Sequence, residues 1–275
     1  MDFPLARQRF YQEINQPDEQ IDLAKAALYL AQEEYPDLDP EDYLNALDTL
    51  ATEVAERLPG TRYPLRIIQT INQYLYEDLG FTGNAEQYYD PRNSYLNQVI
   101  DRRTGIPITL SLVYLEVAQR LDFPMVGVGM PGHFMIRPAI EEMQIFVDPF
   151  HKGETMFAED CQERLSEIYG RPMELRPEFM EPVGSRYFLA RMLTNLKAIY
   201  LSQGDADKTL AMVDRILLLF PEAPGERRDR GLLHYQLGQW REAYQDLQDY
   251  LEQQPGAQDS AAIEQLLRRI ENKEE

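Results

Sequence analysis

The segment 106–121, IPITLSLVYLEVAQRL, constrains the fold of this chain more than any other stretch. Its only charged residues are Glu116 and Arg120, both in its second half. A helix of that composition is buried on most of its sides, so other elements must surround it. The chain therefore needs a core with a helix at its centre.

Three short apolar or alternating runs follow this helix and indicate strands. They are residues 123–128, 134–137 and 145–147. The connecting segments 130–133 and 139–142 have the composition of turns, which favours a small antiparallel sheet. A helix that leads into a run of strands is typical of the α+β class.

The N-terminal part is expected to be helical. Residues 20–34 carry the apolar stripe of an amphipathic helix. Asp39 followed by Pro40 is typical of the start of a second helix, and a third should follow Pro64. Residues 81–97 are rich in Gly, Asn and Tyr without periodicity, which predicts an ordered surface loop.

The last third of the chain is helical and repetitive. Gly204 and Gly238 lie 34 residues apart, and so do Pro221 and Pro255. A period of 34 residues with a turn glycine and a terminal proline matches the helix–turn–helix tetratricopeptide repeat. The sequence therefore predicts two such repeats near the C-terminus.

These patterns together predict two domains. The first, residues 1–185, combines a helical N-terminal part with the α+β core and its small antiparallel sheet. The second, residues 186–275, is all-α and holds the two repeats and a capping helix at 260–270.

The charge, the apolar pattern and the cysteine content of the chain exclude several classes of protein. Asp plus Glu number 47 against 27 Lys plus Arg, a net charge of −20, which repels nucleic acid. No uncharged apolar stretch reaches the roughly 18 residues of a membrane span, and the N-terminus lacks a secretory signal. The single cysteine, Cys161, excludes an internal disulfide framework. We expect a cytoplasmic protein without a membrane span or a nucleic-acid partner.

Three motifs near the chain's centre carry a family resemblance. They are NSYLNQVIDRRTGIPI at residues 93–108, PGHF at 131–134 and VDPF at 147–150. They resemble the transglutaminase-like core of the bacterial SirB family, in which such a core is followed by tetratricopeptide repeats. The likeness extends over residues 15–255 and implies a papain-like fold.

The resemblance also implies a catalytic triad, of which this chain lacks one member. Transglutaminase-like enzymes use a cysteine at the start of a buried helix, a histidine on a following strand and an aspartate on the next. The matching positions here are Pro107, His133 and Asp148. Because proline has no nucleophilic atom, the resemblance implies a catalytically degenerate member. Cys161 matches no catalytic position and is interpreted as a structural thiol.

A hydroxyl group is the alternative nucleophile. Ser111 shares a helix face with Pro107 but lies one turn further along, whereas Thr109 faces away. The competing interpretation is that both are buried polar side chains that bond to carbonyls one turn earlier. Similarly, three interpretations of His133 are open: a structural residue whose ring pairs with Asp148, a ligand-binding residue, or a catalytic one.

Basic side chains next to the motif are candidate binding residues. Arg102 and Arg103, with the neighbouring Arg92 and Asn97, form a small basic cluster that would accept a carboxylate such as a peptide C-terminus. The alternative is that these arginines simply pair with acidic residues, namely Asp90, Asp101 and Glu116.

Two further residues are candidates because of their spacing from His133 and Asp148 in the sequence. Arg137 follows His133 four residues later, which places it on the same face of an extended strand and makes it a candidate binding residue that contributes charge to the cleft. The alternative is that Arg137 only solvates the edge of the sheet. His151, three residues after Asp148, would complete a metal-binding set of two histidines and a carboxylate. We assign no metal and no cofactor from the sequence, and keep this set as a hypothesis.

Three functions are consistent with these features. The leading hypothesis is a non-catalytic interaction protein that binds a polypeptide through its transglutaminase-like cleft and its helical repeats. The second is a hydrolase or acyltransferase that uses His133 and Asp148 with Ser111 or an activated water. The third is a metal-dependent activity at the two histidines and Asp148. The sequence does not identify the partner or the oligomeric state.

Overall fold

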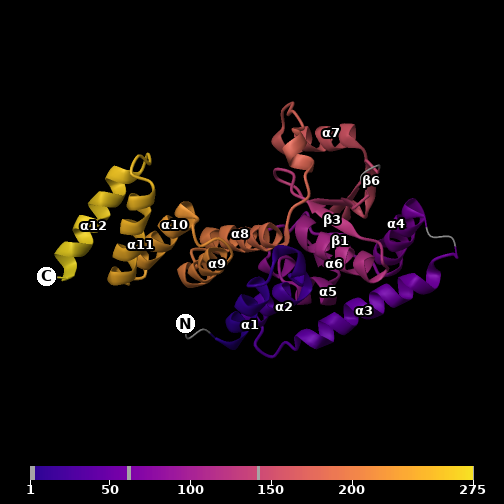
Figure 1. The fold of residues 1–275 in the computed structure, drawn as a ribbon, viewed down its shortest axis with the longest axis horizontal. Coiled ribbons are helices and arrows are strands. Elements are labelled where there is room, and N and C mark those ends of the chain that lie inside the picture. Colours follow the sequence, from indigo (N-terminus) through magenta and orange to yellow (C-terminus); the bar gives the residue numbers. More distant parts are fainter. Residues whose placement is uncertain (1–3, 61–62, 141–142, 275) are drawn as a thin grey trace. The chain divides into compact units, whose positions relative to one another are not determined.

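The computed structural model describes residues 4–60, 63–140 and 143–274, and the chain divides into two compact units. These units are Met1–Leu189 and Ala190–Glu275 (Figure 1). The first is the α+β unit that the sequence predicts, and the second is all-α.

The first unit begins with a run of helices. They are α1 (Leu5–Ile14), α2 (Leu23–Glu34), α3 (Pro40–Arg57) and α4 (Pro64–Asn72), with the short 3-10 helix η1 (Asp18–Gln20) before α2. The predicted starts of α3 and α4 are confirmed. Asp39 accepts a hydrogen bond from the backbone of Glu41, and Pro40 takes the first helical position. Helix α1 was not predicted.

A π-helical segment and a loop connect α4 to the centre of the unit. They comprise η2 (Gln73–Asp78), β1 (Thr82–Gly83), η3 (Pro91–Asn93), α5 (Leu96–Arg102) and β2 (Thr104–Gly105). Strands β1 and β2 pair in parallel. The predicted loop therefore holds one short strand and one 3-10 turn, and α5 starts at its end.

Helix α6 (Pro107–Arg120) is the buried helix that the composition predicts. Eleven of its residues are buried, among them Thr109, Ser111 and Glu116. Helix α3 and strands β3 and β4 pack against it. This packing explains why the segment carries so few charges.

A four-stranded antiparallel sheet follows α6. Its strands lie in the order β3 (Met125–Val128), β4 (Met135–Pro138), β5 (Phe146–Asp148) and β6 (Glu154–Met156). The three predicted strands are confirmed and β6 is an addition. The predicted turn at 139–142 includes residues 141–142, which lie outside the described part of the chain. In the register, Ile136 is opposite Val147, which itself faces Thr155.

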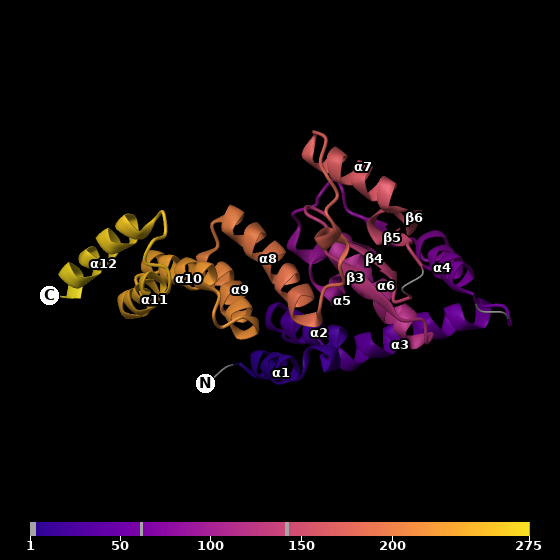
Figure 2. The same ribbon diagram turned by 45° about the horizontal axis from the view of Figure 1, so that its top comes forward.

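The sheet lies between α6 and a second helix, α7 (Ala158–Tyr169), as Figure 2 shows. Methionine side chains fill the core against α7: Met130, Met135 and Met156 pack with Cys161 and Leu165 of that helix. The 3-10 helix η4 (Pro149–His151) joins β5 to β6, and η5 (Pro177–Met180) follows α7. The loop η4 therefore lies at the end of the strand that carries Asp148.

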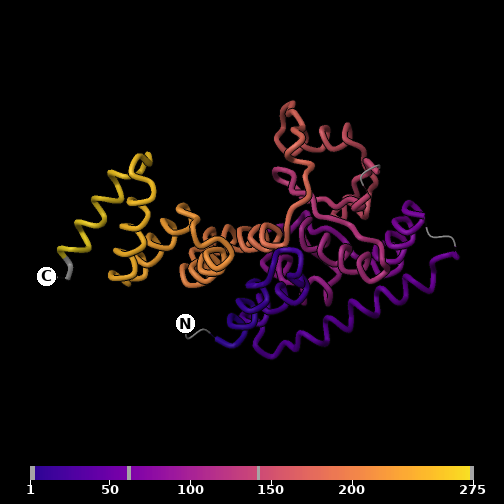
Figure 3. Tube along the Cα trace, viewed as in Figure 1, coloured from indigo at the N-terminus to yellow at the C-terminus, as the bar shows by residue number. Residues whose placement is uncertain are grey.

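The second unit consists of successive helices, which Figure 3 traces along the chain. Helix α8 (Ser185–Gln203) begins in the first unit, and α9 (Ala206–Leu219), α10 (Pro224–Gln236), α11 (Trp240–Gln253) and α12 (Ser260–Glu274) follow. Gly204 and Gly238 adopt φ angles of 72° and 74° at equivalent helix ends. Glycine is favoured there because other residues rarely adopt this left-handed conformation.

Across the part of the chain that the structure describes, no helix combines the length and apolar character needed to cross a bilayer.

Candidate functional site

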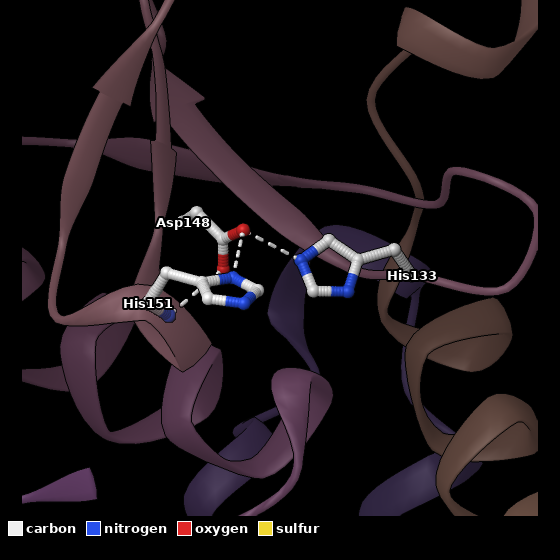
Figure 4. Close-up of side chains that lie close together, drawn as sticks. All are labelled: His133, Asp148 and His151. Carbon is white, nitrogen blue, oxygen red and sulfur yellow. Dashed lines mark hydrogen bonds and ion pairs between the residues drawn. The ribbon is translucent and has the colours of Figure 1, made fainter. Parts of the chain in front are cut away.

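The structure brings His133 and Asp148 together in the first unit. His133 lies in the turn before β4, and Asp148 is the last residue of β5. The distance between His133 Nε2 and Asp148 Oδ2 is 2.8 Å (Figure 4). His133 is 5% exposed and Asp148 is fully buried. The antiparallel pairing of β4 with β5 accounts for their proximity.

Asp148 also begins the 3-10 helix η4, and its second oxygen caps that helix. Oδ1 accepts hydrogen bonds from the backbone N–H groups of Phe150, at 3.0 Å, and of His151, at 3.3 Å. The side chain of His151 turns back, so that its Nδ1 lies 2.8 Å from Asp148 Oδ2. His151 is therefore a third member of the cluster, as Figure 4 shows.

These donors keep Asp148 ionised. Burial opposes the charge, but the hydrogen bonds from His133 and His151 outweigh it and hold the pKa of Asp148 well below its usual range. At neutral pH the site therefore contains a buried carboxylate.

Arg164 on α7 is the fourth member of the cluster. Its Nη1 lies 3.3 Å from Asp148 Oδ2 and also contacts the ring of His151. Its Nη2 donates to Glu154 Oε2 at 2.8 Å, and its Nε lies 3.6 Å from Glu167 Oε2. A single guanidinium thus faces three carboxylates.

Aromatic rings cover one side of this cluster. The ring of Phe150 lies 6.2 Å from that of His133 and 6.2 Å from that of Tyr88. Tyr89, next to Tyr88, is 71% exposed. A Cβ atom on Gly83 would lie 2.6 Å from the Phe150 ring, so only glycine allows β1 to pass this closely. We call Tyr88, Tyr89, Phe150 and His151 the aromatic patch.

The position at the start of α6 that the resemblance assigns to the nucleophile carries neither a thiol nor a hydroxyl. Pro107 is the first residue of the helix. Thr109 Oγ1 accepts a hydrogen bond from the backbone N–H of Ile106, at 3.1 Å, and shares its one proton between the carbonyl oxygens of Asn93, at 2.7 Å, and Ile106, at 3.2 Å. The contact with the carbonyl of Ile106, one turn earlier, is the one that the structural interpretation predicts. For Ser111 that interpretation is wrong, because its buried Oγ has no partner among the described residues. Ser111 consequently makes no hydrogen bond to His133.

The predicted basic cluster is only partly assembled. Arg92 and Arg102 share Asp90, with Nη2–Oδ2 distances of 2.6 and 3.7 Å. Arg103 instead donates to the carbonyl of Leu79 and lines a separate pocket of about 390 Å³. Asn97 is 3% exposed, and its Oδ1 has no partner within the described ranges.

The predicted pairing of these arginines holds for Asp90 alone. Asp101 accepts a hydrogen bond from Tyr43 instead, and Glu116 forms an ion pair with Arg120. The partner of Asp101 is therefore Tyr43 on α3, and the partner of Glu116 is Arg120 on α6.

Arg137 and Cys161 lie apart from the cluster. Arg137, on β4, lines a pocket of about 310 Å³ with Phe146, Met180 and Glu181. His133 precedes the strand, so strand alternation does not place the two side chains on one face. Cys161, on α7, is fully buried, and this burial raises the pKa of its thiol to about 12. Such a thiol is protonated and unreactive at neutral pH.

Sequence reasoning missed Arg164 and the aromatic patch as a group. Arg164 lies on a polar helix whose pattern contains no sign of a buried partner. Tyr88 lies in the loop after β1 and Phe150 in η4, and β1 packs against η4. Long-range contacts of this kind leave no periodic signal.

Comparisons with known proteins agree with this architecture. Residues 41–194 match the model of the Transglutaminase-like superfamily, and residues 196–268 match that of the Tetratricopeptide repeat. A UPF0162 protein of Xylella fastidiosa (strain 9a5c) is 39% identical over an alignment of 246 positions, gaps included, that covers 86% of each chain.

More distant relatives share the same region. A UPF0162 protein of Pseudomonas aeruginosa is 30% identical over 215 residues, 78% of each chain. Human F-box only protein 21 is 26% identical over an alignment of 268 positions, gaps included, that covers 83% of this chain and 41% of that protein.

Proposed function

Because the chain belongs to the UPF0162 family and joins a transglutaminase-like domain to tetratricopeptide repeats, we propose that it is a non-catalytic protein that binds a polypeptide partner. We further propose that the chain is a member of the SirB family and that it is located in the cytoplasm. The repeats themselves favour a role in protein interaction.

The observation that carries the proposal is Pro107. It occupies the position that the resemblance gives to the catalytic cysteine, at the first residue of α6. Proline offers neither a nucleophile nor a backbone N–H for an oxyanion. An inherited site that keeps the histidine and the aspartate but lacks the nucleophile is suited to holding a chain and not to cleaving it.

The aromatic patch is the surface that we expect a polypeptide to contact. Tyrosine and phenylalanine offer large contact area at low conformational cost, and Tyr89 is 71% exposed. F-box only protein 21 carries the same region within a longer chain, so this module also occurs joined to other sequence.

A peptide array probed with the full chain tests this proposal. We expect a subset of peptides to bind, and Tyr89→Ser to weaken that binding about tenfold, the loss typical of a central aromatic contact. Tyr63→Ser is the matched control, because Tyr63 is 55% exposed outside the patch. If the folded protein binds no peptide, or if both variants weaken binding equally, the proposal is wrong.

The alternative function is a hydrolase or acyltransferase. It is favoured by the intact pair of His133 and Asp148 and by the unpartnered hydroxyl of Ser111. In this mechanism His133 takes a proton from Ser111 or from a water molecule, and Asp148 orients the imidazole.

A fluorophosphonate probe distinguishes the two functions. Labelling of the wild-type chain that disappears in both Ser111→Ala and His133→Ala would favour the serine enzyme. Turnover of acyl esters without labelling, lost in His133→Ala, would indicate an activated water. Under our proposal neither signal is seen.

A further inference from the structure

We infer that His133, Asp148 and His151 form a binding site for a divalent transition-metal ion such as Zn²⁺. One potential ligand atom from each residue lies within 4.8 Å of the other two. Two of these separations are 2.8 Å, from Asp148 Oδ2 to His133 Nε2 and to His151 Nδ1 (Figure 4). Ligand atoms bonded to one Zn²⁺ at about 2.0–2.2 Å lie roughly 3 Å apart, so small side-chain shifts suffice.

The hydrogen bonds of the cluster cannot all form at once. His151 Nδ1 must carry a proton to donate to Asp148, yet it must present a lone pair to accept from Arg164. Three nitrogen atoms also converge on one oxygen, Asp148 Oδ2. A bound cation removes this conflict, because both imidazoles and the carboxylate then direct lone pairs to the same point.

The charge around the cluster favours a cation. Asp148, Glu154 and Glu167 all lie near the guanidinium of Arg164, which supplies the single positive charge among these four groups. Arg164 holds Glu154 through Nη2 at 2.8 Å, and that contact can remain when Nη1 leaves Asp148. Arg164 therefore competes with the metal ion for Asp148 and keeps its contact with Glu154 when the ion binds.

The cluster is also held in place and accessible. The two backbone N–H groups on Asp148 Oδ1 fix the carboxylate, so Oδ2 is oriented before an ion arrives. Asn72 Nδ2 donates to the carbonyl of Gly153 at 2.7 Å and anchors the loop after His151. His133 and Asp148 are buried, whereas the His151 side chain is 44% exposed and offers an entry route.

The ligand set selects the class of ion. Two imidazoles and one carboxylate suit Zn²⁺, Ni²⁺, Co²⁺ or Fe²⁺, whereas Mg²⁺ and Ca²⁺ prefer oxygen ligands. Three protein ligands leave at least one coordination position for another molecule. This inference stands independently of the polypeptide-binding proposal.

Calorimetric titration of the full chain with Zn²⁺, after dialysis against a chelator, tests the site. We expect one equivalent to bind and Mg²⁺ not to compete. His151→Ala should abolish binding, and because this side chain is 44% exposed the variant should keep its fold, checked by circular dichroism. His234→Ala, in the second unit, should bind as the wild type does. Arg164→Gln should bind about tenfold more tightly, because it removes a competing charge.

Two outcomes overturn the inference. If His151→Ala retains stoichiometric zinc, the ion binds elsewhere on the acidic surface. If neither the wild type nor Arg164→Gln binds zinc, the cluster is a hydrogen-bonded assembly alone. Loss in His151→Ala together with tighter binding in Arg164→Gln supports it, since no other site predicts opposite effects at these two positions.

Discussion

At the scale of single residues, Asp148 determines how the site is organised. Its carboxylate is fully buried and receives donors from two histidines, an arginine and two backbone N–H groups. Buried carboxylates are tolerated only when they are paired and hydrogen-bonded in this way. The family resemblance identifies His133 and Asp148, but the remaining donors come from the tertiary fold and have no local signature.

Asp148→Asn should destabilise the chain by about 2–4 kcal/mol at neutral pH, because the charged hydrogen bonds are lost. The depressed pKa of Asp148 fixes the sign of the pH dependence. Its contribution is complete above the unfolded value of about 4 and is lost as pH falls from there toward the folded value. Urea unfolding from pH 7 down to pH 3 measures both effects.

The difference between wild type and Asp148→Asn should therefore shrink as the solution becomes more acidic. A gap that stays constant over this range would contradict the ionised state of Asp148. The conservative amide keeps the side-chain volume, so a packing defect does not account for the effect.

Ser111 and Thr109 give opposite predictions although both are buried on α6. Ser111→Ala removes an unpartnered hydroxyl and should be neutral or stabilising by up to about 1 kcal/mol. Thr109→Val removes the hydrogen bond that Oγ1 donates to Asn93 and the one that it accepts from Ile106 N–H, and should cost about 1–2 kcal/mol. Chemical denaturation of the two variants provides the comparison, and a costly Ser111→Ala would show that its hydroxyl is bonded after all.

At the scale of elements, local signals decided which parts could be predicted. Helix α3 starts at a capping aspartate followed by proline, so both its position and its type follow from the sequence. Helix α1 lacks a side-chain cap and has no such signal. Strand β6 has two exposed residues out of three, so no alternation marks it. The π-helical hydrogen bonding of η2 likewise has no pattern in the sequence that predicts it.

Substitution of Gly204, a turn glycine between repeat helices, should change the free energy of unfolding only through the backbone conformation. Gly204 has a φ of 72°, and a Cβ atom there would meet no atom within 4 Å. Gly204→Ala should cost about 1–2 kcal/mol, because only the left-handed conformation opposes it. Gly225, which has the same open space without a positive φ, is the control.

Gly225→Ala lies in the first turn of α10 and should be neutral or stabilising by up to about 1 kcal/mol, since alanine favours the helix. Thermal unfolding of both variants gives the comparison. Equal effects at the two positions would mean that the left-handed geometry does not limit Gly204.

At the scale of the whole molecule, the net charge of −20 sets which partners can approach. Nucleic acids are polyanions that bind proteins mainly through lysine and arginine at phosphates, with release of counterions. Most arginines near the motif already pair with acidic residues of the same chain, as Arg92 and Arg102 do with Asp90. The chain as a whole thus presents a repulsive field to a phosphate backbone.

We therefore expect no mobility shift of duplex DNA or single-stranded RNA at micromolar protein concentration, even in about 20 mM salt. Attraction between a basic protein and nucleic acid would be strongest there, because screening is weakest. The protein should also pass through a heparin column and be retained on an anion exchanger at pH 7. A mobility shift at low salt that weakens steeply with added salt would reveal a local basic surface whose attraction outweighs the net negative charge of the chain.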